Sequence, residues 1–151
     1  MWCQVSHNER GSQCDQETCP VDKQALIESI AYCGLVCGLC HLSTDCDGCK
    51  NTAKLCSRSE VCNQRTCCLQ RGLQGCWECA EFSCGEDMHG PTHDLRIRAF
   101  VAFIKTEGAV TLVNCLLRNE ARGIHYGHNR DYDGKSCEEE VIQLLKTGLS
   151  G

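Results

Sequence analysis

Seventeen cysteines dominate the chemistry available to this chain of 151 residues. Twelve of them fall in the segment 33–84. Three pairs in that segment have the C-x2-C spacing: Cys37/Cys40, Cys46/Cys49 and Cys76/Cys79. Two thiolates from one such tight turn can bind a single tetrahedral metal ion, and three pairs together are a far stronger signal than one. The sequence therefore predicts that residues 33–84 bind metal through thiolates.

Zinc is the expected metal, because tetrahedral thiolate sites suit it and it needs no assembly machinery. The spacing leaves open how the cysteines divide into sites, although we expect two four-cysteine sites. It assigns no role to Cys3, Cys14, Cys19, Cys56 or Cys68. The predicted ligands are Cys33, Cys37, Cys40, Cys46, Cys49, Cys62, Cys67, Cys76, Cys79 and Cys84.

An iron–sulfur cluster or a thiol-based redox or electron-transfer centre is the alternative, since cysteine thiolates hold such clusters as well. The bacterial ferredoxin run is absent, and Cys19-Pro20 lacks its partners. Cys33-x3-Cys37-x2-Cys40 is also the spacing of radical S-adenosylmethionine enzymes, but that motif counts only in a βα barrel, which this chain does not resemble. We predict no reaction, and we expect a binding protein rather than an enzyme.

The chain reads as a cytoplasmic protein. Its cysteine count is odd and residues 1–10 are polar, without an apolar run of signal-peptide length, so a secreted disulfide scaffold is disfavoured. The longest wholly apolar run, 99–104, is too short to cross a membrane. A net charge of -5 gives no general attraction to nucleic acid. The expected partner is another protein.

Apolar residues and cysteines divide the chain into three stretches. Residues 1–21 form a polar arm, and 22–148 are expected to form a single domain that contains the cysteine-rich segment 33–84 and a helical subdomain, 92–148. The segment 33–84 has too few large apolar side chains to offset the entropy of ordering its backbone. We expect a mainly α, metal-stabilised fold, in which an irregular cysteine-rich segment with short helices packs on the C-terminal helical subdomain.

Helical periodicity and capping residues locate the elements. A short helix is predicted from Asp22, as N-cap, to about Tyr32, and further turns at 61–70 and 76–82. Helices are expected at 95–106, after a cap at Thr92 or Asp94, and at 109–122, on both sides of Gly108. The last helix is expected to begin at Ser136, which would form a capping box with Glu139, and to end near Gly148. Cys115 lies among apolar residues and is interpreted as a core residue.

Two further groups can bind metal ions in principle. Residues 129–140 nearly match a calcium-loop pattern, but a polar turn before the last helix is the preferred interpretation. His125 and His128 are interpreted as solvated loop residues. His41, next to Cys40, is the better candidate for a substitute ligand.

Four runs carry a resemblance to a known family: YCGLVCGLC at 32–40, CDGC at 46–49, CNQRTC at 62–67 and GLQGCWECAEFSC at 72–84. In this order they resemble the prokaryotic family called domain of unknown function 3795. The resemblance implies a cysteine-rich, metal-binding module of the prokaryotic cytosol, and it implies no reaction. The chain departs from the family's pattern at Ser59, where a cysteine is usual, and at Ser83, where a proline is usual.

Overall fold

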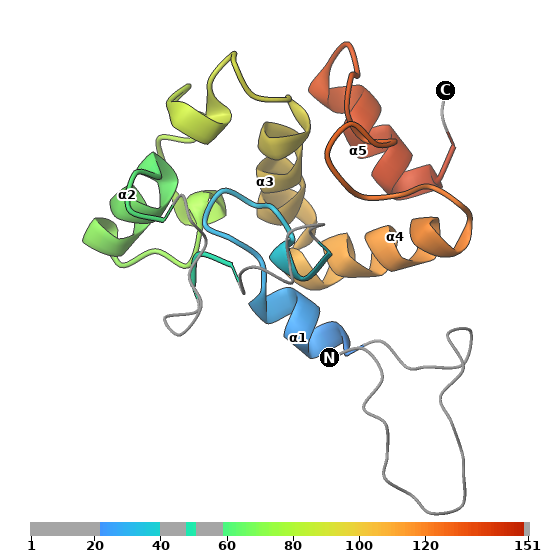
Figure 1. Cartoon of the computed structure of the whole chain (residues 1–151), viewed down its shortest axis with the longest axis horizontal. Coiled ribbons are helices and arrows are strands. Elements are labelled where there is room, and N and C mark those ends of the chain that lie inside the picture. The colour runs from blue at the N-terminus through green and yellow to red at the C-terminus, as the bar shows by residue number, and fades with distance from the viewer. Residues whose placement is uncertain (1–21, 40–47, 51–58, 150–151) are drawn as a thin grey trace, which may run out of the picture.

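A computed structural model of the chain describes residues 22–39, 48–50 and 59–149 (Figure 1). Five α-helices and three short 3₁₀ turns are the regular elements of these residues, and their only β-pairing is an isolated bridge between Ile30 and Val36. The expected mainly helical fold with an irregular cysteine-rich segment is therefore confirmed. The polar arm, 1–21, lies outside the described residues, and the proposed domain boundaries stay a prediction.

Helix α1 (Lys23–Glu28) begins where the sequence predicts. Asp22 is extended, and its carboxylate accepts a hydrogen bond from the backbone N–H of Ala25 at 3.0 Å, which caps the helix. The helix ends at Glu28, before the predicted Tyr32, because the chain then turns back to pair Ile30 with Val36. This reversal brings Cys33 and Cys37, the first residue of the 3₁₀ turn η1 (Cys37–Leu39), close together in space.

Helix α2 (Asn63–Arg71) carries two adjacent cysteines and ends at Gly72, as predicted. Gly72 has a φ of 67°, a left-handed conformation that glycine adopts without strain. The helical turn expected at 76–82 is shorter, a single 3₁₀ turn, η2 (Cys76–Glu78). A third turn, η3 (Asp87–His89), leads into the helical subdomain.

The helical subdomain contains α3 (Arg96–Glu107), α4 (Ala109–Ala121) and α5 (Glu138–Thr147). Gly108, with a φ of 91°, separates α3 from α4 as predicted. The predicted start of the last helix at Ser136 is two residues too early. Cys137 is the N-cap, and the carboxylate of Glu140 accepts the Ser136 N–H at 2.9 Å in place of the expected capping box with Glu139.

Helix α3 connects the two halves of the molecule, with α2 on one side of it and α5 on the other (Figure 1). One face supplies Phe100 and Phe103 to an apolar core shared with α1, α4 and α5, where Cys115 is buried as expected. The other face supplies Val101, which packs on Cys68 and Cys76. A Cβ atom at Gly34 would lie 2.7 Å from the Val101 side chain, so glycine is needed for this close approach.

Candidate metal centre

Four cysteines form what we call the first thiol group: Cys33, Cys37, Cys49 and Cys62. Burial raises the pKa of Cys33, a backbone hydrogen bond from Leu35 opposes that shift, and the other three thiols of the group raise the pKa further. The other three thiols therefore lie within electrostatic reach of Cys33. The segment 48–50 lies directly against η1, since a Cβ atom at Gly48 would meet the Cys37 sulfur at 3.3 Å.

Arg65 of α2 holds this segment in place. Its Nε donates a hydrogen bond to the Cys49 carbonyl at 3.1 Å. Cys62, the N-cap of α2, is buried, and so are Cys33 and Cys49. The first thiol group thus combines the turn after α1, the segment 48–50 and the start of α2.

Five further cysteines form the second thiol group and line one cavity of about 60 Å³: Cys67, Cys68, Cys76, Cys79 and Cys84. The first two lie on α2 and the next two on or beside η2. The Sγ atoms of Cys68 and Cys76 are 3.9 Å apart. Arg71 and His89 also line the cavity, and the Arg71 guanidinium donates to the Cys79 sulfur at 3.7 Å.

Four buried thiols, two in each group, hold their protons more tightly than an ordinary cysteine in the absence of a cation. Burial is the main cause of the raised pKa of Cys33, Cys49, Cys68 and Cys76. Neighbouring thiols raise each pKa further, because a second negative charge nearby disfavours ionisation. A cation placed among these sulfurs would reverse both effects, since a coordinated thiol loses its proton.

Lys50 is a cation that both thiol groups share. Burial lowers the pKa of its ammonium group, while Cys49, Cys68 and Cys37 act in the opposite direction. The ammonium lies 4.8 Å from the ring centre of Tyr32 and 5.1 Å from that of Trp77, so two aromatic faces hold it in place. This arrangement supplies one positive charge between two sets of sulfur atoms.

One pair of sulfurs in the second thiol group has the separation that two thiolates take on a tetrahedral thiophilic ion. Two Zn–S bonds of about 2.3 Å at a tetrahedral angle separate their sulfurs by about 3.8 Å. The distance between Cys68 and Cys76 is close to this value. Within the described residues, however, no three His, Cys, Asp or Glu side chains are already gathered closely enough to hold one ion.

Eight of the ten predicted ligands lie within the described residues, four of them in the first thiol group and four in the second. Cys40 and Cys46 lie outside the described residues, as do Cys3, Cys14, Cys19, Cys56 and His41. Of the three C-x2-C pairs, Cys76/Cys79 is therefore the one described in full. Both of its thiols line the cavity.

Residues 42–89 match the model of a family described as a protein of unknown function, DUF3795. We call residues 42–89, which are similar to this family, the DUF3795 segment. The DUF3795 match contains the whole second thiol group, and it begins after Cys33 and Cys37, whereas the resemblance noted in the sequence extends from 32 to 84. No curated protein and no solved structure matches the chain.

The C-terminal end of the DUF3795 segment is His89, which is 2% exposed. Its ring Nε2 lies 3.4 Å from the Cys33 carbonyl oxygen, and its ring packs edge-on against Phe82 with centroids 5.3 Å apart. Since a carbonyl oxygen can only accept, Nε2 carries the proton and Nδ1 presents a lone pair. Burial lowers the pKa of His89, which favours the neutral ring.

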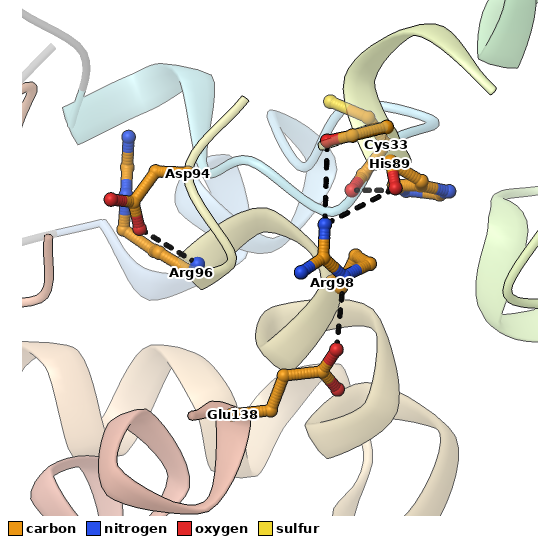
Figure 2. Close-up of polar contacts among 7 residues, drawn as sticks. Cys33, His89, Asp94, Arg96, Arg98 and Glu138 are labelled. Atoms are coloured by element: carbon orange, nitrogen blue, oxygen red, sulfur yellow. Dashed lines mark hydrogen bonds and ion pairs between the residues drawn. The ribbon is translucent and has the colours of Figure 1, made fainter. Parts of the chain in front are cut away.

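Arg98 of α3 ties this end of the DUF3795 segment to the helical subdomain (Figure 2). Its NH1 donates to the His89 carbonyl at 3.2 Å and its Nε donates to the Glu138 carboxylate, at the start of α5, at 3.0 Å. Figure 2 also shows Asp94, one of the two predicted caps of α3. Leu95 occupies the N-cap position instead, but the Asp94 carboxylate accepts the backbone N–H of Arg96, the first residue of the helix, at 2.9 Å. The cavity wall is therefore fixed to rigid helices.

Among the described residues of the DUF3795 segment, sequence reasoning assigned no role to Cys68, His89 or Lys50. Cys68 follows a predicted ligand directly, and adjacent cysteines commonly face different ways. The structure places both Cys67 and Cys68 on the cavity wall. The spacing Cys84-x4-His89 resembles that of zinc ligands and was the available signal for the histidine.

The calcium-like pattern at 129–140 forms a polar turn, as interpreted from the sequence. Asp133 makes an ion pair with Arg96, with 2.5 Å between Oδ1 and Nε, and both side chains are 7% exposed. Its second oxygen accepts the Asn129 N–H at 2.6 Å. Asp131 accepts the His125 N–H at 2.6 Å. The carboxylates are thus already engaged by the chain itself.

Proposed function

We propose that this protein is a zinc-binding, cysteine-rich interaction module, in which the metal holds the segment 33–84 in the shape that another protein recognises. Zinc would be held by thiolates of the first and second thiol groups. Bound there, it supplies positive charge and tetrahedral geometry and no redox chemistry. No reaction is part of the proposal.

The observation that carries the proposal is the cavity lined by five cysteines. Cysteine is often buried merely as a small apolar residue. Five cysteines from α2, η2 and the following loop around one space of about 60 Å³ are a different arrangement, because it gathers soft donor atoms from separate elements. Two of these sulfurs also lie at nearly the separation expected on a tetrahedral zinc ion, which further supports the proposal.

The energetic role of the metal follows from what the segment lacks. Its described part is held by short helical elements, single hydrogen bonds such as Cys76 N–H to the Tyr32 carbonyl at 2.9 Å, and packing on Val101. Structural zinc contributes on the order of 10 kcal/mol per site in small metal-dependent domains. Such a contribution would replace the apolar core that this segment is too poor in large side chains to form.

A reducing compartment such as the cytoplasm suits this proposal, because ligand thiols must remain unoxidised. None of the helices in the described part of the chain is long and apolar enough to span a membrane. A protein partner is favoured over nucleic acid, since the net charge of -5 gives no general attraction to phosphates.

The proposal is tested by purifying the chain under reducing, oxygen-free conditions, recording the visible spectrum and measuring bound metals. We expect a colourless protein with about two zinc ions per chain. A brown protein that contains iron and sulfide would contradict the zinc proposal. A colourless protein without metal would contradict any metal-thiolate function.

A thiol-based redox function is the second candidate, and one observation favours it. The buried Cys68 and Cys76 sulfurs lie 3.9 Å apart, so oxidation to a disulfide requires only a small movement. Oxidative release of zinc would combine both functions. Mass mapping after mild peroxide treatment tests the redox function, and the expected product is a disulfide between Cys68 and Cys76.

A further inference from the structure

We propose that His89 is a metal ligand through Nδ1 and that it shares one ion with Cys68 and Cys76, which makes the second thiol group a mixed thiolate and imidazole site. The remaining position belongs to one of the other thiols on the same cavity wall. This proposal rests on the metal-thiolate function above. It adds two ligands, Cys68 and His89, that the cysteine spacing does not assign.

The first argument is the geometry of the two sulfurs. Cys68 and Cys76 come from different elements, α2 and η2, yet their Sγ atoms are separated by 3.9 Å, against about 3.8 Å for two thiolates on one tetrahedral zinc ion. Both residues are buried against Val101, so this pair is held by packing as well as by the turn. The pair therefore offers a preformed two-sulfur site.

The second argument is independent and concerns His89. This residue lines the same cavity and is 98% buried, and its Nδ1 has no hydrogen-bond partner among the described residues. An unpaired buried polar atom destabilises the fold, so its persistence calls for an explanation. A metal ion that accepts the Nδ1 lone pair provides one.

The surroundings of the ring match those of a histidine ligand. Metal-bound histidines usually donate their other ring N–H to a carbonyl or carboxylate, which fixes the tautomer and the orientation of the ring. The contact from Nε2 to the Cys33 carbonyl does this, and it also links the second thiol group to a residue of the first. The edge-on packing against Phe82 and the bond from Arg98 to the His89 carbonyl restrict the ring further.

The present arrangement offers two sulfurs at the right separation and leaves the other donors on the cavity wall, rather than three donors already around one point. Metal binding would draw in the remaining donors, since ligand positions and local folding are commonly coupled in metal-dependent domains. Two residues with freedom to adjust are Cys84, which is exposed, and Cys79, which is half-buried.

The test uses the full reduced chain loaded with cadmium-113, whose NMR shift depends on how many sulfurs bind it. Three variants are compared with the wild type: His89→Phe keeps an aromatic ring without nitrogen, His89→Cys replaces imidazole by a thiolate, and His93→Phe is the matched control. His93 is a half-buried loop histidine four residues further along the chain, and its Nδ1 is already engaged with the Asp87 carbonyl at 3.0 Å. Selective nitrogen-15 labelling of histidine adds a direct readout in the wild type.

We expect about two cadmium signals from the wild type, one of them shifted toward mixed sulfur and nitrogen ligation and coupled to a histidine nitrogen. His89→Phe should weaken that site at least about tenfold. His89→Cys should retain the ion and move its signal to the all-sulfur region, and His93→Phe should change neither signal.

Two results separate the failure of this inference from that of the proposed function. Cadmium signals that are all-sulfur, uncoupled to histidine nitrogen and unaffected by both His89 variants would overturn the role of His89 while metal binding stands. A wild-type chain that binds no cadmium or zinc would overturn both. The nitrogen coupling in the wild type decides the question even if His89→Phe does not fold.

Discussion

The helical subdomain and the cysteine-rich segment solve the same physical problem in different ways. In the first, Phe100, Leu112, Tyr132 and Leu145 are almost fully excluded from water, and three helices share one apolar core. In the second, a large share of the buried residues are cysteines: Cys33, Cys49, Cys62, Cys68 and Cys76. Apolar burial can stabilise the subdomain without any ligand. The cysteine-rich segment gains most of its stability, on our account, from a ligand it must acquire.

One chemical change in each region tests whether metal stabilises the cysteine-rich segment and not the helical subdomain. Cys76→Ser removes a thiolate from the cavity wall, and we expect it to lose a metal ion and with it binding energy on the order of 10 kcal/mol. Cys115→Ser buries a hydroxyl in the apolar core and should cost only about 1–3 kcal/mol, without loss of metal. Metal analysis and urea unfolding measure both effects. Equal metal content in the two variants would contradict the assignment of metal binding to the cysteine-rich segment.

A smaller effect is expected at the ion pair of Arg96 and Asp133, which belongs to the helical subdomain. Asp133→Asn leaves a buried guanidinium charge without its partner and should destabilise the protein by about 3–5 kcal/mol. Glu107→Gln, which breaks the exposed pair with Lys146, is the control and should cost about 0–1 kcal/mol. Urea unfolding gives both values. A loss of bound metal in Asp133→Asn would show that the two regions are not independent.

The helical subdomain should also respond to alkaline pH. Burial raises the pKa of Tyr132 to about 12, against about 10 in an unfolded chain, while its hydrogen bond with Asn119 at 3.0 Å acts in the other direction. The folded state therefore keeps a proton that the unfolded state loses. Stability should be unaffected by this group below about pH 10 and should fall by about 2–3 kcal/mol between pH 10 and 12.

Tyr132→Phe tests the assignment, because phenylalanine has no proton to lose. Urea unfolding midpoints measured from pH 9 to 12 should fall less steeply in this variant than in the wild type. The variant will also lose the hydrogen bond to Asn119, so the slope with pH, and not the absolute stability, is the informative quantity. An unchanged slope would assign the pH dependence to other groups.

The smallest losses of stability are expected from substitutions at two glycines that follow helices, one in each region. Gly72 and Gly123 have φ values of 67° and 84°, and a Cβ atom added to either would meet nothing within 4 Å. Alanine should therefore cost only backbone strain, about 1 kcal/mol at each position. Hydrogen exchange should show a loss of amide protection in α2 for Gly72→Ala and in α4 for Gly123→Ala. If each variant lost protection evenly in both helices, the two regions would unfold as one cooperative unit.

The ends of several helices were accessible to sequence reasoning because local signals determine them. Asp22, Gly108 and Gly148 mark helix ends through capping and left-handed backbone, and these marks need no knowledge of distant residues. The start of α5 was missed by two residues because Glu140, rather than Glu139, bonds back to Ser136.

The candidate site was only partly accessible, since its assembly depends on contacts between distant parts of the chain. Spacing identifies Cys76 and Cys79 as a pair, but it does not show that Cys68 lies beside Cys76. Nor does it show that His89 reaches the Cys33 carbonyl. The first relation arises from the packing of α2 and η2 on Val101, and the second joins residues 56 positions apart, so no local pattern encodes either.

Hydrogen exchange measured with and without a strong chelator tests the central claim most directly. The reduced full chain is compared before and after metal removal, and protection is read separately for α2 and for α4 and α5. We predict that α2 and the turn η2 lose most of their protection on chelation, while α4 and α5 keep theirs. Unchanged protection in α2 after complete metal removal would contradict the account, because the segment would then hold its fold without the ion.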